Sequence, residues 1–182
     1  NVPPYHNQLS QLKKLIKKGF PLEQCVLRID PIFPTSNGLK RVCEVLDMAF
    51  DMQLLPRMRV RISIFDEYPH VKERFRKIGF VPIYGPNFYA SKSMMDDVCN
   101  TLSQYDIQFH TCAEPYLNSP DGLFVHSGCI SEIDLQILGL QLDSNTKVNM
   151  QNRNGCLCLS CKTELLNCKH PCKHQCIYCY WK

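Results

Sequence analysis

The sequence lacks any apolar run long enough to span a bilayer, and its N-terminus has no signal-peptide pattern. It also lacks a basic stripe with interleaved aromatic residues, so there is no clear nucleic-acid signal. The formal net charge is only +4 and counts every cysteine as a neutral thiol, so charge alone indicates no class of partner. Because no apolar run is long enough to span a bilayer, we expect no membrane partner. Because the first residue is Asn1 rather than Met, we interpret the chain as a processed product or an N-terminally truncated fragment.

Cysteine is the residue that the chain has in unusual number, with twelve among 182 residues. Three of them, Cys25, Cys43 and Cys99, stand alone within apolar or helical patterns and are interpreted as core residues. Seven crowd the end of the chain: Cys156, Cys158, Cys161, Cys168, Cys172, Cys176 and Cys179. A secreted protein would use such residues for disulfides, but the chain has no secretory context. The crowding favours metal or cluster ligation, because several sulfurs must converge on one centre.

The pattern of apolar residues before the cysteine-rich end alternates between helical and strand periodicity. Helices are predicted over residues 9–16, 38–52, 71–78 and 93–105, the last with a capping box of Ser93 and Asp96. A short helix is predicted to start at Ser131 with Asp134. Strands are predicted over 25–29, 59–65 and 107–112, the first ended by Asp30-Pro31. Strands alternating with helices predict an α/β fold, here a partial (β/α) barrel of parallel strands over 1–140, followed by an irregular cysteine-rich segment of the same domain over 141–182.

Polar residues collect at the ends of the three predicted strands, where parallel α/β folds place their chemistry. They are Arg28 and Asp30, Ser63 and Asp66, and Cys112 and Glu114. An equally simple interpretation is that the aspartates cap turns or the helices that follow. Polar residues at all three ends favour a site.

The strongest local motif is the C-x3-C-x2-C pattern of Cys172, Cys176 and Cys179, with Tyr178 just before the third cysteine. Three thiolates in a tight loop can hold an iron–sulfur cluster and leave one iron open for a small molecule. The alternative is a zinc knot, since His170 and His174 lie among these cysteines and closed tetrahedral zinc sites are common. On spacing alone both interpretations stay open.

The chain resembles the family called domain of unknown function eighteen-forty-eight. The resemblance is carried by segments whose order spans nearly the whole chain, namely residues 27–32, 59–63, 112–114, 128–130, 156–160 and 172–180. The C-terminal cysteines resemble the cluster motif of radical S-adenosylmethionine (SAM) enzymes, and the chain is distantly similar to spore photoproduct lyase. This resemblance implies a [4Fe–4S] cluster on Cys172, Cys176 and Cys179, with SAM cleaved reductively to start radical chemistry on an unknown substrate. It implies cofactor contacts from Arg28, Asp30, Ser63 and Glu114, and an electron donor such as a ferredoxin or flavodoxin.

A second metal site is also predicted. Cys112, Cys129, Cys156 and Cys158 match resembling positions and would hold an auxiliary cluster or a zinc ion. A local set of Cys156, Cys158, Cys161 and Cys168 is the alternative, although Cys161 and Cys168 lie outside the family pattern. Some of these residues would otherwise be plain buried thiols.

Three functions compete at this point: a radical SAM-like enzyme, a non-catalytic α/β module with a structural zinc knot, and an iron–sulfur electron-transfer protein. Catalytic residues are not assigned. The thiols and an oxygen-sensitive cluster predict a reducing, cytoplasmic location.

Overall fold

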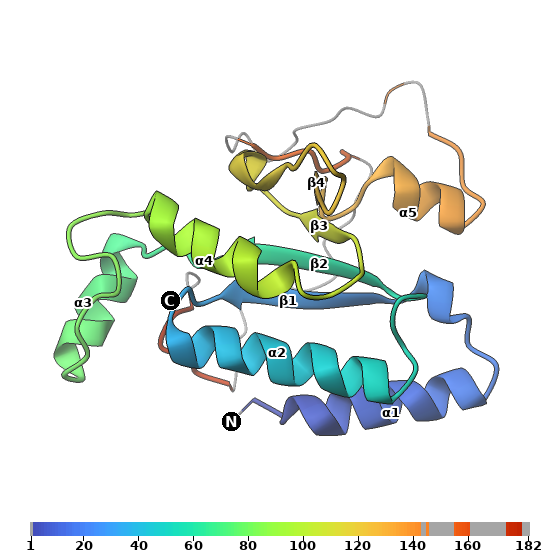
Figure 1. Ribbon diagram of the computed structural model, residues 1–182, viewed down its shortest axis with the longest axis horizontal. Helices are drawn as coiled ribbons and strands as arrows, with labels where there is room; N and C mark the ends of the chain where they lie inside the picture. The colour runs from blue at the N-terminus through green and yellow to red at the C-terminus, as the bar shows by residue number, and fades with distance from the viewer. Residues whose placement is uncertain (1, 143–144, 146–154, 161–173, 180–182) are drawn as a thin grey trace.

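The computed structural model describes residues 2–142, 145, 155–160 and 174–179. Its centre is a parallel sheet of four strands in the order β1-β2-β3-β4, formed by β1 (Val26–Ile32), β2 (Arg59–Ile64), β3 (Phe109–Thr111) and β4 (Phe124–His126). The sheet is not closed on itself (Figure 1), and this arrangement is consistent with a partial barrel. The predicted α/β class with parallel strands is thereby confirmed.

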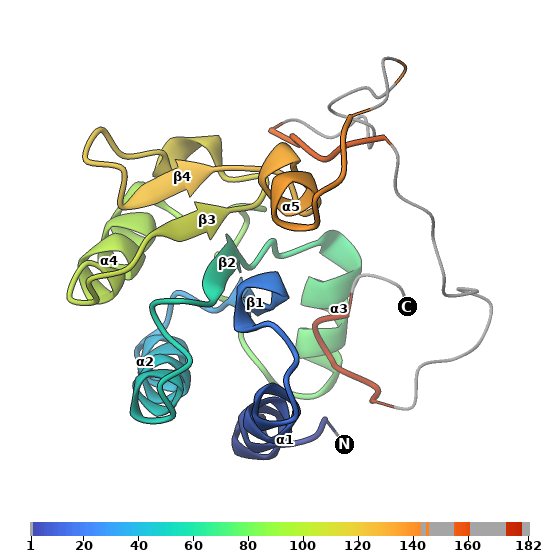
Figure 2. The same ribbon diagram turned by 90° about the vertical axis from the view of Figure 1, so that its right-hand side faces the viewer.

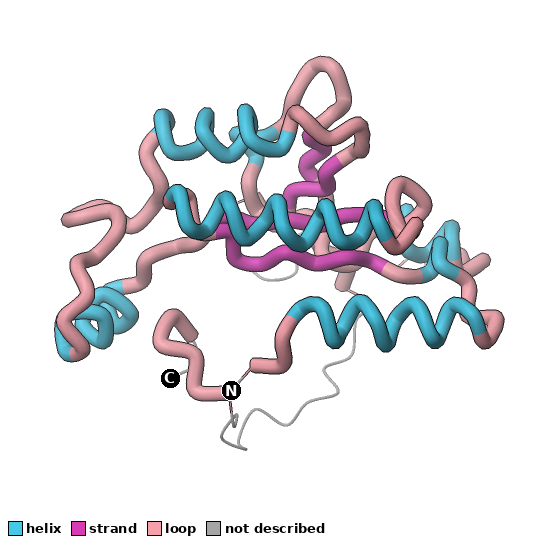
Figure 3. The backbone as a smooth tube through the Cα atoms, turned by 60° about the horizontal axis from the view of Figure 1, so that its bottom comes forward, coloured by secondary structure: helices cyan, strands magenta, loops and turns pink. Residues whose placement is uncertain are grey.

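Helices flank this sheet on both sides. They are α1 (Tyr5–Lys17), α2 (Ser36–Asp51), α3 (Pro69–Lys77), α4 (Lys92–Leu102) and α5 (Glu132–Ile137), with short 3₁₀ turns η1 (Leu22–Gln24) and η2 (Pro115–Leu117). Figure 2 shows α2 and α4 on one side of the strands, and α5 on the other. In Figure 3 the described C-terminal segments are drawn as loop. None of the helices in the described part of the chain is long and apolar enough to cross a membrane.

Strict alternation in β2 gives the sheet two different faces. Val60, Ile62 and Ile64 are buried in the core, together with Leu46 of α2 and Leu102 of α4. Helix α2 presents its apolar residues at helical spacing and is capped by Thr35, whose side chain accepts a hydrogen bond from the Gly38 amide. This half of the molecule is an ordinary helix-on-sheet core.

The opposite face of the sheet is polar and charged. In the strand register Arg28 pairs with Arg61, and Arg61 pairs with His110, so three basic residues lie in one row across β1, β2 and β3. Parallel strands usually consist of continuous hydrophobic runs, because helices cover both faces of the sheet. The departure from that rule here marks the face on which a site is built.

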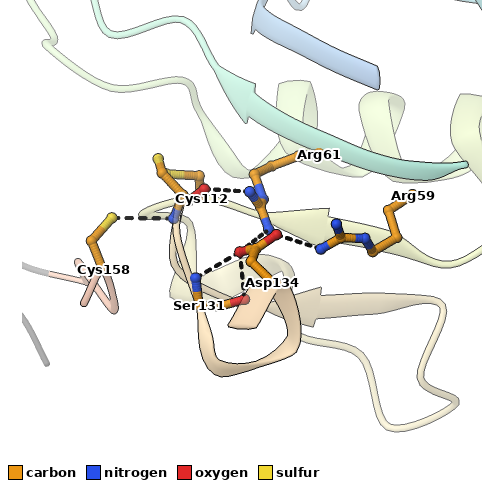
Figure 4. Close-up of polar contacts among 7 residues, drawn as sticks. Arg59, Arg61, Cys112, Ser131, Asp134 and Cys158 are labelled. Atoms are coloured by element: carbon orange, nitrogen blue, oxygen red, sulfur yellow. Dashed lines mark hydrogen bonds and ion pairs between the residues drawn. The ribbon is translucent and has the colours of Figure 1, made fainter. Parts of the chain in front are cut away.

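Arg61 is buried on this polar face, with an exposed fraction of 4%. One of its terminal nitrogens donates to the carbonyl of Cys129, and the other lies 3.3 Å from the Asp134 carboxylate (Figure 4). Arg59 pairs with the other oxygen of Asp134. The oxygen that faces Arg61 also accepts hydrogen bonds from the Ser131 amide and hydroxyl, which caps α5. One carboxylate therefore compensates two arginines and fixes the start of a helix.

His110 is also buried, and its pKa is lowered by that burial and by the charges of Arg61 and Arg59. A neutral imidazole is thus favoured beside the arginine pair.

A buried carboxylate fixes the loop after α3. Glu67 is fully buried and accepts hydrogen bonds from the amides of Ile83 (2.7 Å) and Tyr84 (2.9 Å), with Lys72 at 3.7 Å. The Tyr84 hydroxyl donates to the carbonyl of Phe65 at 2.6 Å. Tyr84 is therefore a packed residue of this loop.

Three sequence-based expectations were wrong in detail. The sheet has four strands, not three, because β4 has only three residues and is too short to show a periodicity. Strand β1 continues past Pro31, which is tolerated because β1 is an edge strand and the register shifts between Ile29 and Ile32. The cap of α4 is Ser91, which accepts from the Met94 amide, and not Ser93.

The Asp134→Asn variant should be less stable than the wild type by about 3 kcal/mol at pH 7, because the buried guanidinium of Arg61 and the partly buried one of Arg59 lose their counter-charge. Burial acts to raise the pKa of Asp134, but hydrogen bonds from Arg59 and Ser131 and the charge of Arg61 lower it overall. The stabilisation is therefore present above the unfolded pKa of about 3.9 and is lost as the pH falls through the lower folded value. Urea unfolding between pH 7 and pH 3 measures this, with Asp106→Asn, at an exposed aspartate, as control. A stability difference that stays constant down to pH 3 would contradict the assignment.

Candidate metal and cofactor pocket

A pocket of about 580 Å³ lies at the carboxyl ends of the strands. Its walls come from β1, β2, the loops that follow β3 and β4, and both described C-terminal segments. Its lining includes Arg28, Asp30, Ser63, Cys112, Cys129, Cys156, Cys158, Cys176, Tyr178 and Cys179. Residues far apart in sequence, which were predicted for two separate metal sites, thus line one pocket.

Arg28, Asp30 and Ser63 form a connected polar group in this pocket. Arg28 donates from Nε to the Asp30 carboxylate at 2.7 Å, and the Ser63 hydroxyl donates to the other carboxylate oxygen. All three side chains lie on the polar face of the sheet, Arg28 and Asp30 on β1 and Ser63 on β2. Arg28 and Asp30 keep 47% and 27% of their side chains exposed, so a bound molecule can reach both.

Segment 155–160 is held against the loop after β4 by backbone contacts. The Leu159 amide donates to the carbonyl of Ile130 at 3.0 Å, and His126 shares a 2.7 Å hydrogen bond with the carbonyl of Gly155. A Cβ at Gly128 would lie 2.4 Å from the carbonyl oxygen of Leu157, so only glycine permits this approach. The approach brings Cys129 beside Cys158.

The four cysteines at this end of the pocket lie close together. The Sγ atoms of Cys112 and Cys129 are 2.7 Å apart, and the Cys129 amide donates to the Cys158 sulfur at 3.1 Å (Figure 4). Cys156 shares a hydrogen bond with Cys158. The hydrogen bond from Cys112 and the positive charge of Arg28 lower the pKa of Cys129, whereas the hydrogen bond to Cys129 and burial raise the pKa of Cys112. Deprotonation of Cys129 is therefore favoured over deprotonation of Cys112.

The described C-terminal turn lies at the other side of the pocket. The Cys179 amide donates to the carbonyl of Cys176 at 3.1 Å, which closes the turn around Tyr178. The Tyr178 ring packs edge-on against Phe33, with ring centroids 5.3 Å apart. Burial and a hydrogen bond with Cys176 raise the pKa of Tyr178 to about 12, so the phenol is neutral at pH 7.

Arg74 of α3 fastens this turn and was not recognised in the sequence. Its Nε donates to the carbonyl of Ile177 at 3.0 Å, and a terminal nitrogen donates to the carbonyl of Cys179. No local spacing could reveal this contact, because the partners are more than one hundred residues apart. Arg61 and Gly128 lie in segments that carry the family resemblance, but the sequence motifs assigned a supporting role neither to them nor to Arg74.

The other predicted site residues are placed as follows. Glu114 accepts a 3.0 Å hydrogen bond from the Ile64 amide and does not line the pocket, so its predicted cofactor contact stays a prediction. Cys172, Cys161 and Cys168 lie outside the described residues. Among the residues that are described, no group of three or more His, Cys, Asp and Glu side chains is arranged to hold a metal ion. The pocket thus holds both described members of the predicted cluster motif and all four members of the predicted second site.

Comparison with protein families gives one match. The model of a family described as Domain of unknown function (DUF1848) covers residues 1–181. Neither the curated proteins nor the solved structures gave a match.

The Arg74→Ala variant should expose Cys176 and Cys179 to alkylation. Loss of charge-assisted hydrogen bonds worth about 1.5 kcal/mol or more each should raise the alkylation rate of both thiols roughly 10-fold. Iodoacetamide labelling of the reduced, metal-free protein, read by peptide mass spectrometry, measures the rates. Arg76→Ala, at an exposed arginine of the same helix, is the control. Equal rates in the two variants would show that Arg74 does not hold the turn.

Proposed function

This chain belongs to the DUF1848 family, and we propose that it is a radical SAM-like iron–sulfur protein. In this proposal Cys172, Cys176 and Cys179 bind a [4Fe–4S] cluster, and Arg28, Asp30 and Ser63 bind SAM beside it. When bound, the cluster supplies the electron that cleaves SAM reductively. The electron would come from a donor such as a ferredoxin or flavodoxin, and the substrate of the resulting radical is not assigned.

One observation carries the proposal. The C-terminal turn with Cys176 and Cys179 lines the same pocket as Arg28, Asp30 and Ser63, although the turn and the strands are far apart in sequence. That pocket lies at the carboxyl edge of a parallel sheet, where α/β folds place ligands.

The donor atoms suit such a cluster. Thiolates are its usual protein ligands, and the turn presents two of them to the pocket. The third, Cys172, is the member outside the described residues. Arg74 binds main-chain carbonyls of the turn and not its sulfurs.

The polar group on the strands suits an amino acid moiety. A guanidinium binds a carboxylate through paired N–H donors, and a carboxylate accepts hydrogen bonds from an ammonium group. Arg28 and Asp30 offer both, side by side and partly exposed. Ser63 holds Asp30 in place from the neighbouring strand.

Metal analysis and absorption spectroscopy on anaerobically purified protein test the cluster. We expect brown protein, and a variant carrying Cys172→Ala, Cys176→Ala and Cys179→Ala should lose about four irons. The matched control replaces Cys25, Cys43 and Cys99 by alanine, because these three cysteines are half-buried and do not line the pocket. The control should keep its iron.

Other outcomes separate the competing functions. Colourless protein with stoichiometric zinc, and no cluster after reconstitution, would replace the proposal by a zinc-stabilised module. Brown protein that does not cleave SAM under reduction would indicate electron transfer.

Replacement of Arg28 tests the SAM contact separately. Arg28→Gln should weaken SAM binding roughly 10- to 100-fold, the loss expected for one or two hydrogen bonds to a charged group. Iron content should not change, because Arg28 is not a ligand. Arg57→Gln, at an exposed ion pair with Glu23 outside the pocket, is the control for binding measured by equilibrium dialysis. Unchanged affinity in Arg28→Gln would remove this residue from the SAM site.

A further inference from the structure

Three large apolar side chains face solvent where α3 ends. Ile78, Phe80 and Val81 are 51%, 60% and 84% exposed. The Phe80 amide donates to the carbonyl of Phe75 at 2.8 Å, so this segment is fixed to the helix while the three side chains stay in contact with water. Apolar side chains that gather on a surface inside a polar rim mark an interaction site. None of the three lines the pocket, so the proposed cluster and SAM site does not account for them.

Arg74 places this patch beside the turn that carries the two described cysteines of the cluster motif. Its Nε donates to the carbonyl of Ile177 at 3.0 Å. Ile78 lies four residues after Arg74 and therefore on the same face of the helix. Ile177 is itself 41% exposed, and Figure 2 shows segment 174–179 running beside α3. The exposed apolar surface thus reaches the segment to which the proposed function assigns the cluster.

The charge around this patch is predominantly positive. The sequence from 74 to 95 contains four basic residues and no acidic one, and residues 174–179 contain no acidic residue either. Glu73 precedes this stretch and pairs with Lys77 at 2.7 Å, but the exposed Arg76 and Lys77 together outweigh its charge. Binding partners carry surface charge opposite to that of the face they meet. The face therefore fits an acidic partner.

The α3 face consists of four apolar residues with two basic residues at their rim, namely Ile78, Phe80, Val81 and Ile177 with Arg76 and Lys77. We propose that this face docks a small acidic electron-carrier protein. The inference rests on the proposed function, because it needs a cluster on the adjacent turn to receive the electron. The reduced carrier loses one electron to that cluster, and no bond is formed or broken in the step. Four apolar side chains suit the small interfaces of redox partners, and a basic rim speeds the approach of an acidic protein.

Biolayer interferometry of the anaerobically purified full chain on immobilised oxidised flavodoxin, an acidic carrier, measures docking without electron transfer. Arg76→Glu combined with Lys77→Glu should lower the association rate constant roughly 10-fold at low salt. The difference should shrink at about 1 M salt, where the screening length is about 3 Å. The matched control is Lys14→Glu combined with Lys17→Glu, which reverses two charges in the last turn of α1 and should bind like the wild type.

The apolar part of the α3 face is tested separately. Phe80→Ser combined with Val81→Ser should raise the dissociation rate constant at both salt concentrations, because apolar burial does not depend on screening. Circular dichroism establishes that each variant is folded. Stopped-flow reduction of the cluster adds a second measurement: dithionite should reduce all variants at the same rate, whereas reduced flavodoxin should reduce the Arg76→Glu, Lys77→Glu variant more slowly than the wild type.

Unchanged association of the α3 charge variant, or an equal loss in the α1 and α3 variants, would overturn the docking face. So would a dimer of the wild type that Phe80→Ser with Val81→Ser abolishes, since the face would then belong to a second copy of the chain. Absence of iron in the wild type would instead remove the proposed function, while the interferometry still measures the face. Failure of the docking face is therefore distinguishable from failure of the cluster proposal.

Discussion

The buried guanidinium of Arg61 is the contact on which the candidate site depends most. A guanidinium removed from water is costly unless its charge and its N–H donors are satisfied. Here Asp134 supplies the charge, and the carbonyl of Cys129 accepts one of the donors. The same residue therefore ties strand β2 to helix α5 and fixes the loop that carries a pocket cysteine. Stability and site geometry rest on one side chain, so neither can be changed without the other.

The two faces of the sheet have different roles, one in hydrophobic packing and the other in forming the pocket. The apolar face, with Val60 and Ile62, packs on α2 and α4 and provides most of the hydrophobic stabilisation. The polar face carries Arg28, Arg61 and His110 in one row. A closed barrel would turn this face inward, and the open sheet here leaves its carboxyl end accessible as a pocket. Charged residues can lie on this face because a loop, a short helix and the C-terminal segments cover it.

Local patterns in the sequence predicted most of the helices and strands but not the contacts between distant segments. The alternation in 59–64 gave β2, and the Ser131–Asp134 pair gave the start of α5, because both signals lie within a few residues. Strand β4 is too short to produce a period, and its pairing depends on tertiary contacts. The strand-end residues Arg28, Asp30 and Ser63 were expected at a site, and they line the pocket. The approach of segment 155–160 to Gly128 depends on the complete fold, which no spacing encodes.

Arg61 and Arg74 have one property in common: each binds main-chain carbonyls of a segment that carries cysteines. Every residue has a main-chain carbonyl, whatever its side chain. These contacts therefore fix the path of the backbone and do not depend on which side chains the bound residues carry. In evolutionary terms, the contact with Arg74 alone places no constraint on the side chain at Ile177, while it keeps the direction of the neighbouring thiols. A scaffold of this kind can change the lining of its pocket, and with it the molecule it accepts, without losing the geometry of its sulfurs.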